Sequence, residues 1–343
     1  MTDVTTRIAG RAGRITLSRP QALNAITRPM VGTIRDALTA WRDDPTVALV
    51  LMDGEGERAF CAGGDVAYLY TRARQGDFAF AREFWAEEFH LNAEIARYPK
   101  PIVVRMHGYV LGGGVGLASH ASHRLVSDSS RVAMPECTIG YVPDVGGTHL
   151  LALAPGHLGE YLGLTGHRME PGDAILAGFA DRFIPEAAWE PLAARLADTG
   201  DVGMIDAFAT APPPAPLAEH LPAIDAAFSA DDLATLTARL VTSDWGQSVR
   251  RILARQSPLS MATTLALVRT ARQTPGLAAA LTREYRVAWR IIEQGDMLEG
   301  VRAQLIDKDR DPQWADTPDS LSADQVTALT APLGAVDLKL PAV

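Results

Sequence analysis

Cysteine is nearly absent from this sequence, which contains only Cys61 and Cys137 among its 343 residues. Two cysteines are too few for a disulfide framework or a zinc cluster, so they indicate a reducing compartment, and we expect both thiols to be buried. Long apolar runs are also absent, because no stretch reaches the ~18 uninterrupted apolar residues of a membrane helix. The N-terminal MTDVTTRIAG lacks the cationic and apolar regions of a secretory signal. These absences predict a cytoplasmic protein without membrane contact.

An excess of basic residues is missing as well. The chain has 32 lysines and arginines against 41 aspartates and glutamates, which gives a formal net charge of −9. Since nucleic-acid-binding proteins normally carry a basic patch or stripe, we expect no nucleic-acid partner. A polyanionic small ligand is compatible with this charge, because a few arginines or helix N-termini are enough to bind one.

Several catalytic motifs do not occur. The sequence has no Gly-x-Ser-x-Gly elbow, no His-Glu-x-x-His, no Cys-x-x-Cys and no Walker loop, so serine hydrolysis, zinc hydrolysis and thiol redox chemistry lack support. The glycine run at 112–116 comes close to a dinucleotide fingerprint, but Leu117 stands where the last glycine or alanine belongs. The histidines around these glycines lack a metal-ligand spacing. No metal and no separate cofactor are therefore expected.

Local patterns predict a mixed α/β chain. Residues 4–9 and 14–17, separated by a glycine-containing turn, predict a β-hairpin. Buried strands are predicted at 47–52 and 101–106, and a long helix at 77–97.

Particular side chains predict where helices begin. Thr27 and Ser257 are expected as N-caps, each with a proline in the first turn that follows, and Asp65 is expected to cap another helix. Glu88 lies on the apolar stripe of the helix at 77–97. A carboxylate there is costly unless it is paired, so Glu88 should point to the edge of the core or into a polar cavity.

The segment 210–216 contains three successive prolines, which exclude both a helix and a central strand. It predicts a division into a core at 1–210, a proline-rich linker at 211–222 and a mostly helical region at 223–343. The tail after Trp314 is expected to be loose.

The stretch 107–147 is the most informative part of the sequence. Three glycines at 112–114 follow the predicted strand 101–106 and lead into a helix-compatible segment. A helix beginning near Gly113 would expose backbone N–H groups and the positive end of its dipole, which suits a developing oxyanion. The alternative is that these glycines only let helix and strand pack closely.

Two acids follow these glycines. Glu136 lies between Pro135 and Cys137, which offer it no charge partner, so a purely structural role has little support. Asp144 follows a proline, and aspartate there is also a good residue to start a turn or a helix.

Five short motifs occur in the order FCAGGD at 60–65, LGGG at 111–114, MPE at 134–136, PDVGG at 143–147 and EGVRAQLIDKD at 299–309. Together they resemble the enoyl-CoA hydratase/isomerase (crotonase) superfamily, and most closely its 3-hydroxyisobutyryl-CoA hydrolase branch. The resemblance covers 14–314 and is patchy over 200–255. It implies a crotonase-like spiral of ββα units with a helical C-terminal region, an acyl-CoA substrate, and contacts that allow a homo-oligomer.

The resemblance also implies roles for individual residues. The backbone N–H groups of Gly64 and Gly113 would hold the thioester oxygen, while Glu136 and Asp144 would be the acids of the reaction. Hydratases of the superfamily carry a second glutamate where this chain has Gly116, and they usually carry glycine where it has Asp144. The implied substrate-binding set is Glu88, Gly113, Glu136, Asp144, Ala62 and Asp65.

Three functions are compatible with these residues. The first is hydrolysis of an acyl-CoA thioester, with 3-hydroxyisobutyryl-CoA from valine breakdown as the expected substrate. Glu136 would either attack the thioester carbonyl or act as a general base on water. Asp144 would hold the 3-hydroxyl or the water, and would raise the pKa of its neighbour by like-charge repulsion. The alternatives are an enoyl-CoA hydratase or isomerase and a non-catalytic CoA-binding member.

Overall fold

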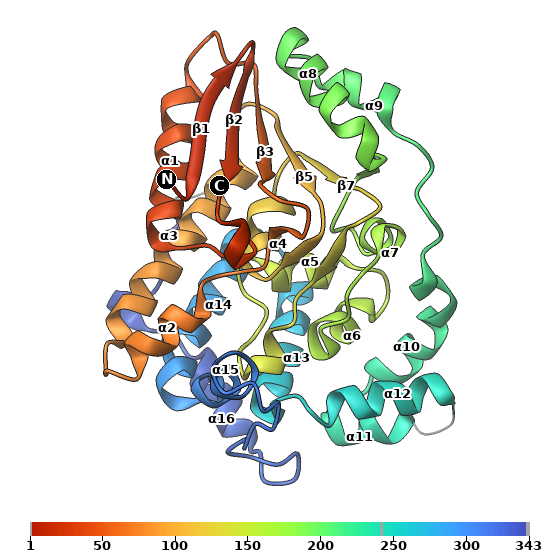
Figure 1. The fold of residues 1–343 in the computed structure, drawn as a ribbon. Helices are drawn as coiled ribbons and strands as arrows, with labels where there is room; N and C mark the ends of the chain where they lie inside the picture. The colour runs from red at the N-terminus through yellow and green to blue at the C-terminus, as the bar shows by residue number, and fades with distance from the viewer. Residues whose placement is uncertain (1, 241–242, 341–343) are drawn as a thin grey trace. The chain divides into compact units, whose positions relative to one another are not determined.

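The computed structural model, drawn in Figure 1, describes residues 2–240 and 243–340. These residues group into two units. The first unit is formed by Met1–Gly64, Glu87–Val132 and Arg168–Pro216, and the second by Asp65–Ala86, Ala133–His167 and Leu217–Val343. Each unit is therefore assembled from segments that are far apart in the sequence.

A six-stranded sheet forms the centre of the first unit, within the described residues. In spatial order its strands are β1 (Val4–Ala9), β2 (Ala12–Leu17), β3 (Leu49–Gly54), β5 (Ile102–Met106), β7 (His123–Val126) and β9 (Arg182–Phe183). β1 and β2 pair antiparallel, and the remaining neighbours pair parallel. The predicted hairpin and the predicted strand at 101–106 are confirmed, and β3 begins two residues later than the predicted 47–52 because 47–48 lie outside the ladder.

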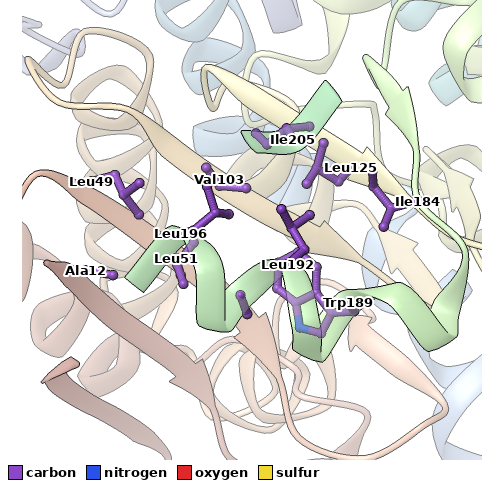
Figure 2. Close-up of a cluster of buried hydrophobic side chains, with 11 residues drawn as sticks. Ala12, Leu49, Leu51, Val103, Leu125, Ile184, Trp189, Leu192, Leu196 and Ile205 are labelled. Carbon is purple, nitrogen blue, oxygen red and sulfur yellow. The ribbon is translucent and has the colours of Figure 1, made fainter. Parts of the chain in front are cut away.

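The sheet is covered on both faces by apolar side chains, as parallel strands require. On one face α8 (Trp189–Thr199) packs against β2, β3 and β5, and Figure 2 shows Leu192 and Leu196 among the strand residues Leu51 and Val103. The helix α1 (Arg28–Arg42) lies on the other face. The indole ring of its Trp41 occupies the space that a side chain at Gly13 of β2 would fill.

A second, three-stranded sheet carries the glycine motifs. It consists of β4 (Ala59–Cys61), β6 (Tyr109–Leu111) and β8 (Arg131–Ala133) in that order. β4 leads into Gly63 and Gly64, and β6 leads into α4 (Gly113–Ala118), so the helix expected near Gly113 is confirmed. The other helices of the first unit are α7 (Pro171–Leu176), α9 (Ile205–Phe208) and the part of α3 (Phe78–Ala96) from Glu87 onward.

The second unit is helical in its described residues. Its helices are α2 (Val66–Ala73), the part of α3 up to Ala86, α5 (Gly147–Leu153), α6 (Leu158–Thr165), α10 (Leu221–Phe228), α11 (Leu233–Arg239), α12 (Asp244–Leu253), α13 (Pro258–Gln273), α14 (Leu277–Gln294), α15 (Met297–Val301) and α16 (Ala323–Thr330). α5, α6 and α13 pack against one another, and α14 packs against α5 (Figure 1). In the described part of the chain, no helix combines the length and apolarity needed to cross a membrane.

The expected helix caps have different outcomes. Asp65 caps α2 by accepting a hydrogen bond from Tyr68 N at 3.2 Å, and Ser257 caps α13 by accepting one from Ser260 N at 3.0 Å. Thr27 does occupy the N-cap position of α1, but its side chain makes no capping hydrogen bond.

The expectation of a loose tail after Trp314 is wrong. Residues Ala323–Thr330 form α16, which begins with a capping box between Ser322 and Gln325 and packs against α13 and α14. Burial of Leu329 supplies the apolar contact that holds this helix in place. The predicted division at the proline-rich linker stays a prediction, although one boundary between the two units falls within it, at Pro216.

Truncation of the α8 face provides a test of this core. Leu192 is fully buried against the sheet, so Leu192→Ala should lower the free energy of unfolding by about 2–5 kcal/mol through lost burial and a residual cavity. Arg195→Ala on the exposed side of the same helix should change it by less than about 0.5 kcal/mol. Urea unfolding of both variants measures these changes. Equal losses of unfolding free energy in the two variants would contradict the packing described here.

Candidate active site

Gly64 and Gly113 bring two backbone amides close together in the first unit. Ile26 N donates a hydrogen bond to Gly63 O at 2.8 Å, which fixes the segment just before Gly64. A Cβ built on Gly113 would lie 3.3 Å from Gly64 N. Among the described residues, neither Gly64 N nor Gly113 N donates a hydrogen bond to a backbone carbonyl group. We call these two groups the amide pair; free N–H donors held side by side can bind an oxyanion.

Close packing, one of the two roles that the sequence left open for the glycine triplet, is observed at Gly114. A Cβ at Gly114 would overlap the carbonyl group of Cys61, so this glycine is required by close packing of α4 on β4. A Cβ at Gly113 would instead lie 2.6 Å from Glu88 Oε1 and 3.1 Å from the side chain of Ile26. Gly113 therefore keeps open the space between the amide pair and the Glu88 carboxyl group.

Glu88 is buried on α3, at 2% exposure. Its carboxyl group lies beside Gly113, with Oε1 2.6 Å from the position that a Cβ on Gly113 would take. The predicted orientation of Glu88 into a polar cavity stays a prediction. Its neighbour Glu87 forms an ion pair with Arg28 at 2.6 Å, which ties this part of α3 to the start of α1.

The loop 19–26 is held against the amide pair by Asn24, which sequence reasoning did not single out. Asn24 is buried in a left-handed conformation, accepts a hydrogen bond from Arg19 N at 2.9 Å and donates one to Ala59 O at 2.9 Å. Ala62, a predicted substrate-binding residue, donates its amide to Leu23 O at 3.0 Å. Its backbone thus holds the loop.

Glu136 opens a tight turn in the second unit, the 3-10 helix η2 (Glu136–Ile139). Two glycines let α15 approach this turn: Gly140 (φ +68°) lies against the Asp296 carbonyl group, and Gly300 lies against the backbone of Ile139. The contact of Gly300 gives the EGVRA motif a structural role. Glu136 itself is 6% exposed, and its Oε2 accepts no hydrogen bond from the described residues.

Asp144 is buried on the loop between η2 and α5, at 5% exposure. The Tyr141 hydroxyl donates a hydrogen bond to Asp144 Oδ2 at 2.9 Å. The Tyr141 ring in turn stacks on Trp85, with ring centroids 5.4 Å apart and an interplanar angle of 12°. The carboxyl group of Asp144 is therefore oriented by a side chain that is itself fixed by packing.

A third buried acid, Glu284 on α14, was missed by sequence reasoning. It accepts hydrogen bonds from Gly146 N at 2.7 Å, from Thr148 N at 2.9 Å and from the Thr148 hydroxyl. The signal that would have found it is a glutamate on the apolar stripe of a helix, the same signal that singled out Glu88. That stripe contains Ala280, Leu281, Val287, Ala288 and Ile291.

We call Glu136, Asp144 and Glu284 the carboxyl cluster, because the three buried carboxyl groups are close enough for the charge of one to raise the pKa of a neighbour. Burial, followed by the negative charges of Asp144 and Glu284, raises the pKa of Glu136 well above its ordinary value. Burial and the charge of Glu284 raise the pKa of Asp144 to about 8, against the opposing effect of the Tyr141 hydrogen bond. Burial raises the pKa of Glu284 to about 7, although its three donors favour the charged form. The cluster therefore retains protons near neutral pH.

The structure thus places the predicted residues in two groups. Gly64, Gly113 and Glu88 lie together in the first unit, and Glu136 and Asp144 lie together in the second. Both cysteines are buried as expected, and burial raises the pKa of each thiol to about 12. Within residues 2–240 and 243–340, no group of histidine, cysteine, aspartate and glutamate side chains is arranged to hold a metal ion.

Comparison with known proteins identifies the family. The family model for enoyl-CoA hydratase/isomerase matches residues 12–329. The chain belongs to this family. Among curated members, the 3-hydroxyisobutyryl-CoA hydrolase, mitochondrial, of Xenopus tropicalis is 37% identical over 97% of this chain and 89% of its own length. The probable 3-hydroxyisobutyryl-CoA hydrolase 3 of Arabidopsis thaliana is 34% identical over 88% of this chain and 83% of its own.

Solved structures of the family confirm the predicted crotonase-like fold. An enoyl-CoA hydratase from Rhodobacter sphaeroides 2.4.1 has a TM-score of 0.94 and 49% identity, covering 99% of this chain and 100% of that one. A carnitinyl-CoA dehydratase from Mycobacterium thermoresistibile has a TM-score of 0.95 and 40% identity, covering 99% of both chains. The names of these relatives include both hydrolases and lyases, so family membership supports an acyl-CoA enzyme without selecting the reaction.

Adding one methyl group at Gly113 should separate folding from turnover. Because Gly113 has an ordinary backbone conformation and the nearest atom to the new Cβ is the movable end of Glu88, Gly113→Ala should still fold. It should lower kcat on a CoA thioester by ~10² or more, because the methyl group fills the space beside the amide pair.

Gly32→Ala is the matched control for this variant. Gly32 lies on the exposed face of α1 with nothing within 4 Å of its added Cβ, so this change should leave turnover intact and stabilise the fold slightly. Turnover by Gly113→Ala at the wild-type rate, measured by thiol release, would remove Gly113 from the proposed machinery.

The raised pKa of Asp144 predicts how stability depends on pH. This carboxyl group binds its proton more tightly in the folded chain than in the unfolded chain, so its contribution to stability is complete below about pH 4 and is lost as pH rises toward about 8. Relative to Asp144→Asn, the wild type should lose at least about 1 kcal/mol of unfolding free energy from about pH 5 to about pH 9. Urea unfolding at both pH values measures the difference. Leu192→Ala alters no titrating group, so its unfolding free energy should differ from that of the wild type by the same amount at both pH values. If the difference between Asp144→Asn and the wild type were also the same at both pH values, the prediction would be contradicted.

Proposed function

We propose that this protein hydrolyses the thioester of a 3-hydroxyacyl-CoA, with 3-hydroxyisobutyryl-CoA as the expected substrate and valine breakdown as the expected setting. The observation that carries the proposal is the burial of Asp144 beside Glu136 in a chain whose glycine motif has Gly116 in place of a second glutamate. The names of the curated relatives support the same reaction and the same substrate.

In this proposal the amide pair binds the thioester oxygen. When the carbonyl carbon is attacked, negative charge develops on that oxygen, and two fixed N–H donors stabilise the charge without reorganising. Glu88, Ala62 and Asp65 remain proposed substrate-binding residues, and Glu88 is the one whose carboxyl group lies at Gly113.

Glu136 is assigned to the attack, and both routes remain open. As a nucleophile its carboxylate would form a mixed anhydride, which water then hydrolyses; as a general base it would take a proton from water as that water attacks. In either route the bond between carbonyl carbon and sulfur breaks, and CoA leaves as a thiolate that takes up a proton. Both routes need the charged form of Glu136, so the rate should rise as pH rises through its elevated pKa.

Asp144 is assigned to the 3-hydroxyl group of the substrate. With its pKa raised to about 8, Asp144 is largely protonated near neutral pH and can donate a hydrogen bond as well as accept one. The Tyr141 hydroxyl occupies Oδ2 and leaves Oδ1 as the group that would meet the substrate.

An enoyl-CoA hydratase or isomerase is the second candidate, favoured by the name of the 49% identical solved structure. The absence of the second glutamate at Gly116 argues against the two-glutamate hydration mechanism, because glycine cannot activate water. A non-catalytic CoA-binding member is the weakest alternative, since it would have no use for the costly burial of Glu136 and Asp144.

Replacement of Glu136 by its amide tests the attacking group. Glu136→Gln keeps the size of the side chain but is neither a base nor a good nucleophile, so kcat should fall by ~10²–10⁴. Binding of the acyl-CoA, measured by calorimetry, should change little. More than about a tenth of the wild-type kcat in this variant would be incompatible with the assigned role.

A panel of three thioesters tests the reaction and the substrate. Release of free CoA from 3-hydroxyisobutyryl-CoA should exceed release from isobutyryl-CoA by at least ~10² in kcat/KM, because a site built to bind a hydroxyl group is left with an unpaired polar group by the deoxy analogue. Asp144→Gly should remove much of that preference without creating a hydratase. Hydration of crotonyl-CoA, which leaves the thioester intact, is the third assay. Equal hydrolysis of the first two thioesters, or dominant hydration, would overturn the proposal.

A further inference from the structure

We propose that Glu284 is a positioning residue that fixes the direction of the Asp144 side chain toward the substrate hydroxyl group. This inference rests on the proposed function, because it concerns the same carboxyl cluster. It assigns a role to a residue that lies in α14, outside the five motifs on which the resemblance rests.

The first observation is that Glu284 accepts three hydrogen bonds from one short segment. Their donors are Gly146 N at 2.7 Å, Thr148 N at 2.9 Å and the Thr148 hydroxyl, and this segment begins two residues after Asp144. Glu284 is fully buried, so these bonds are shielded from water and hold the segment firmly.

The second observation is the backbone conformation between Asp144 and these donors. Val145 has φ 52° and Gly146 has φ 80°, so two successive residues adopt the left-handed region. A β-branched residue rarely adopts it, and such strain persists only where surrounding contacts impose it. The turn is closed by Gly147 N, which donates to Asp144 O at 2.6 Å. Glu284 supplies the contacts that impose this turn, and the turn sets where the Asp144 side chain points.

Glutamine cannot replace glutamate in this arrangement. Each of these three partners of Glu284 donates its hydrogen, while a glutamine amide offers one acceptor oxygen and places an NH₂ group against the remaining donors. Asp144 is thus held from two sides, by Tyr141 at its carboxyl group and by Glu284 through the backbone that follows it.

Glu284 also acts through its charge. Its negative charge raises the pKa of Asp144 and of Glu136, while Arg283 lowers the pKa of Glu284 itself. Besides these groups, the Tyr141 hydroxyl faces Asp144 and the Thr148 hydroxyl faces Glu284. Removing the charge should therefore lower the pKa of Glu136, and hydrolysis that needs the Glu136 carboxylate should begin at lower pH.

The test is the ratio of kcat/KM for 3-hydroxyisobutyryl-CoA to that for isobutyryl-CoA. A loss of folded enzyme lowers both values equally and leaves the ratio unchanged, so the ratio reports recognition of the hydroxyl group at Asp144 and not the amount of active enzyme. In Glu284→Gln the ratio should fall by ~10-fold or more, because a small displacement of an oriented group costs this much. The acid limb of the pH profile should move to lower pH in the same variant.

Two controls accompany this variant. Glu160→Gln removes another fully buried carboxylate of the second unit, which pairs with Arg272 at 2.7 Å, and it should leave the ratio unchanged. Thr148→Val removes one of the three donors but keeps both backbone amides, and its ratio should fall by less than ~3-fold. An unchanged ratio and an unshifted pH profile in Glu284→Gln would reduce Glu284 to a structural cap of α5 and overturn the proposal.

A second variant and a second measurement distinguish a folding defect and a wrong proposed function from a wrong role for Glu284. Should Glu284→Gln not fold, Glu284→Asp decides by the same ratio, because it keeps the charge but withdraws the acceptor by one methylene group. If the wild type releases no CoA from any thioester, the proposed function is wrong, but the contact between Glu284 and the segment after Asp144 can still be tested. Amide hydrogen exchange of Gly146 and Thr148 then tests the contact: exchange at least ~10-fold faster in Glu284→Asp supports it, and unchanged exchange overturns it.

Discussion

Burial of Glu136, Asp144 and Glu284 in one cluster is the constraint to which the second unit is adapted. Each charged carboxylate loses water and repels the others, so the cluster is stable only where donors or protons offset the charge. Glu284 has three donors and Asp144 has the Tyr141 hydroxyl, whereas Glu136 Oε2 has no donor among the described residues. Glu136 is therefore the acid whose charged form is least stabilised, and a poorly solvated carboxylate is the most reactive toward water or a carbonyl group.

Backbone contacts of glycine fix the segments that carry these groups. Gly114 lets α4 approach β4, and Gly140 and Gly300 let α15 approach the turn of Glu136. In each case a polar backbone group occupies the place of a side chain, so the approach is closer than any larger residue allows. The candidate site residues are held by main-chain geometry as much as by side-chain packing, which keeps them in place without adding further charged groups.

The sequence predicted features that depend on neighbours along the chain. The hairpin, the caps at Asp65 and Ser257 and the helix start at Gly113 follow from local patterns, and the structure confirms them. The apolar stripe of α14 could have singled out Glu284 but not its donors, which lie 136 to 138 residues away, a separation at which no spacing rule operates. Asn24 and α16 were missed for related reasons: the left-handed turn of Asn24 is fixed by Ala59 O, and α16 is held by α13 and α14. The motifs located the candidate residues, while the residues that support them lie elsewhere in the chain.

The interleaved assembly of the second unit also bears on how the protein is made. Glu136 and Asp144 leave the ribosome long before the helices that complete their surroundings, since Glu284 follows Thr148 by 136 residues. At ordinary elongation rates of about 5–20 residues per second, that interval lasts roughly 7–27 s. During this time the strained turn at Val145 has no Glu284 to hold it, and the apolar faces of α5 and α6 lack α13. A nascent chain that stalls near the proline-rich linker would thus present both acids on an unfinished, aggregation-prone surface.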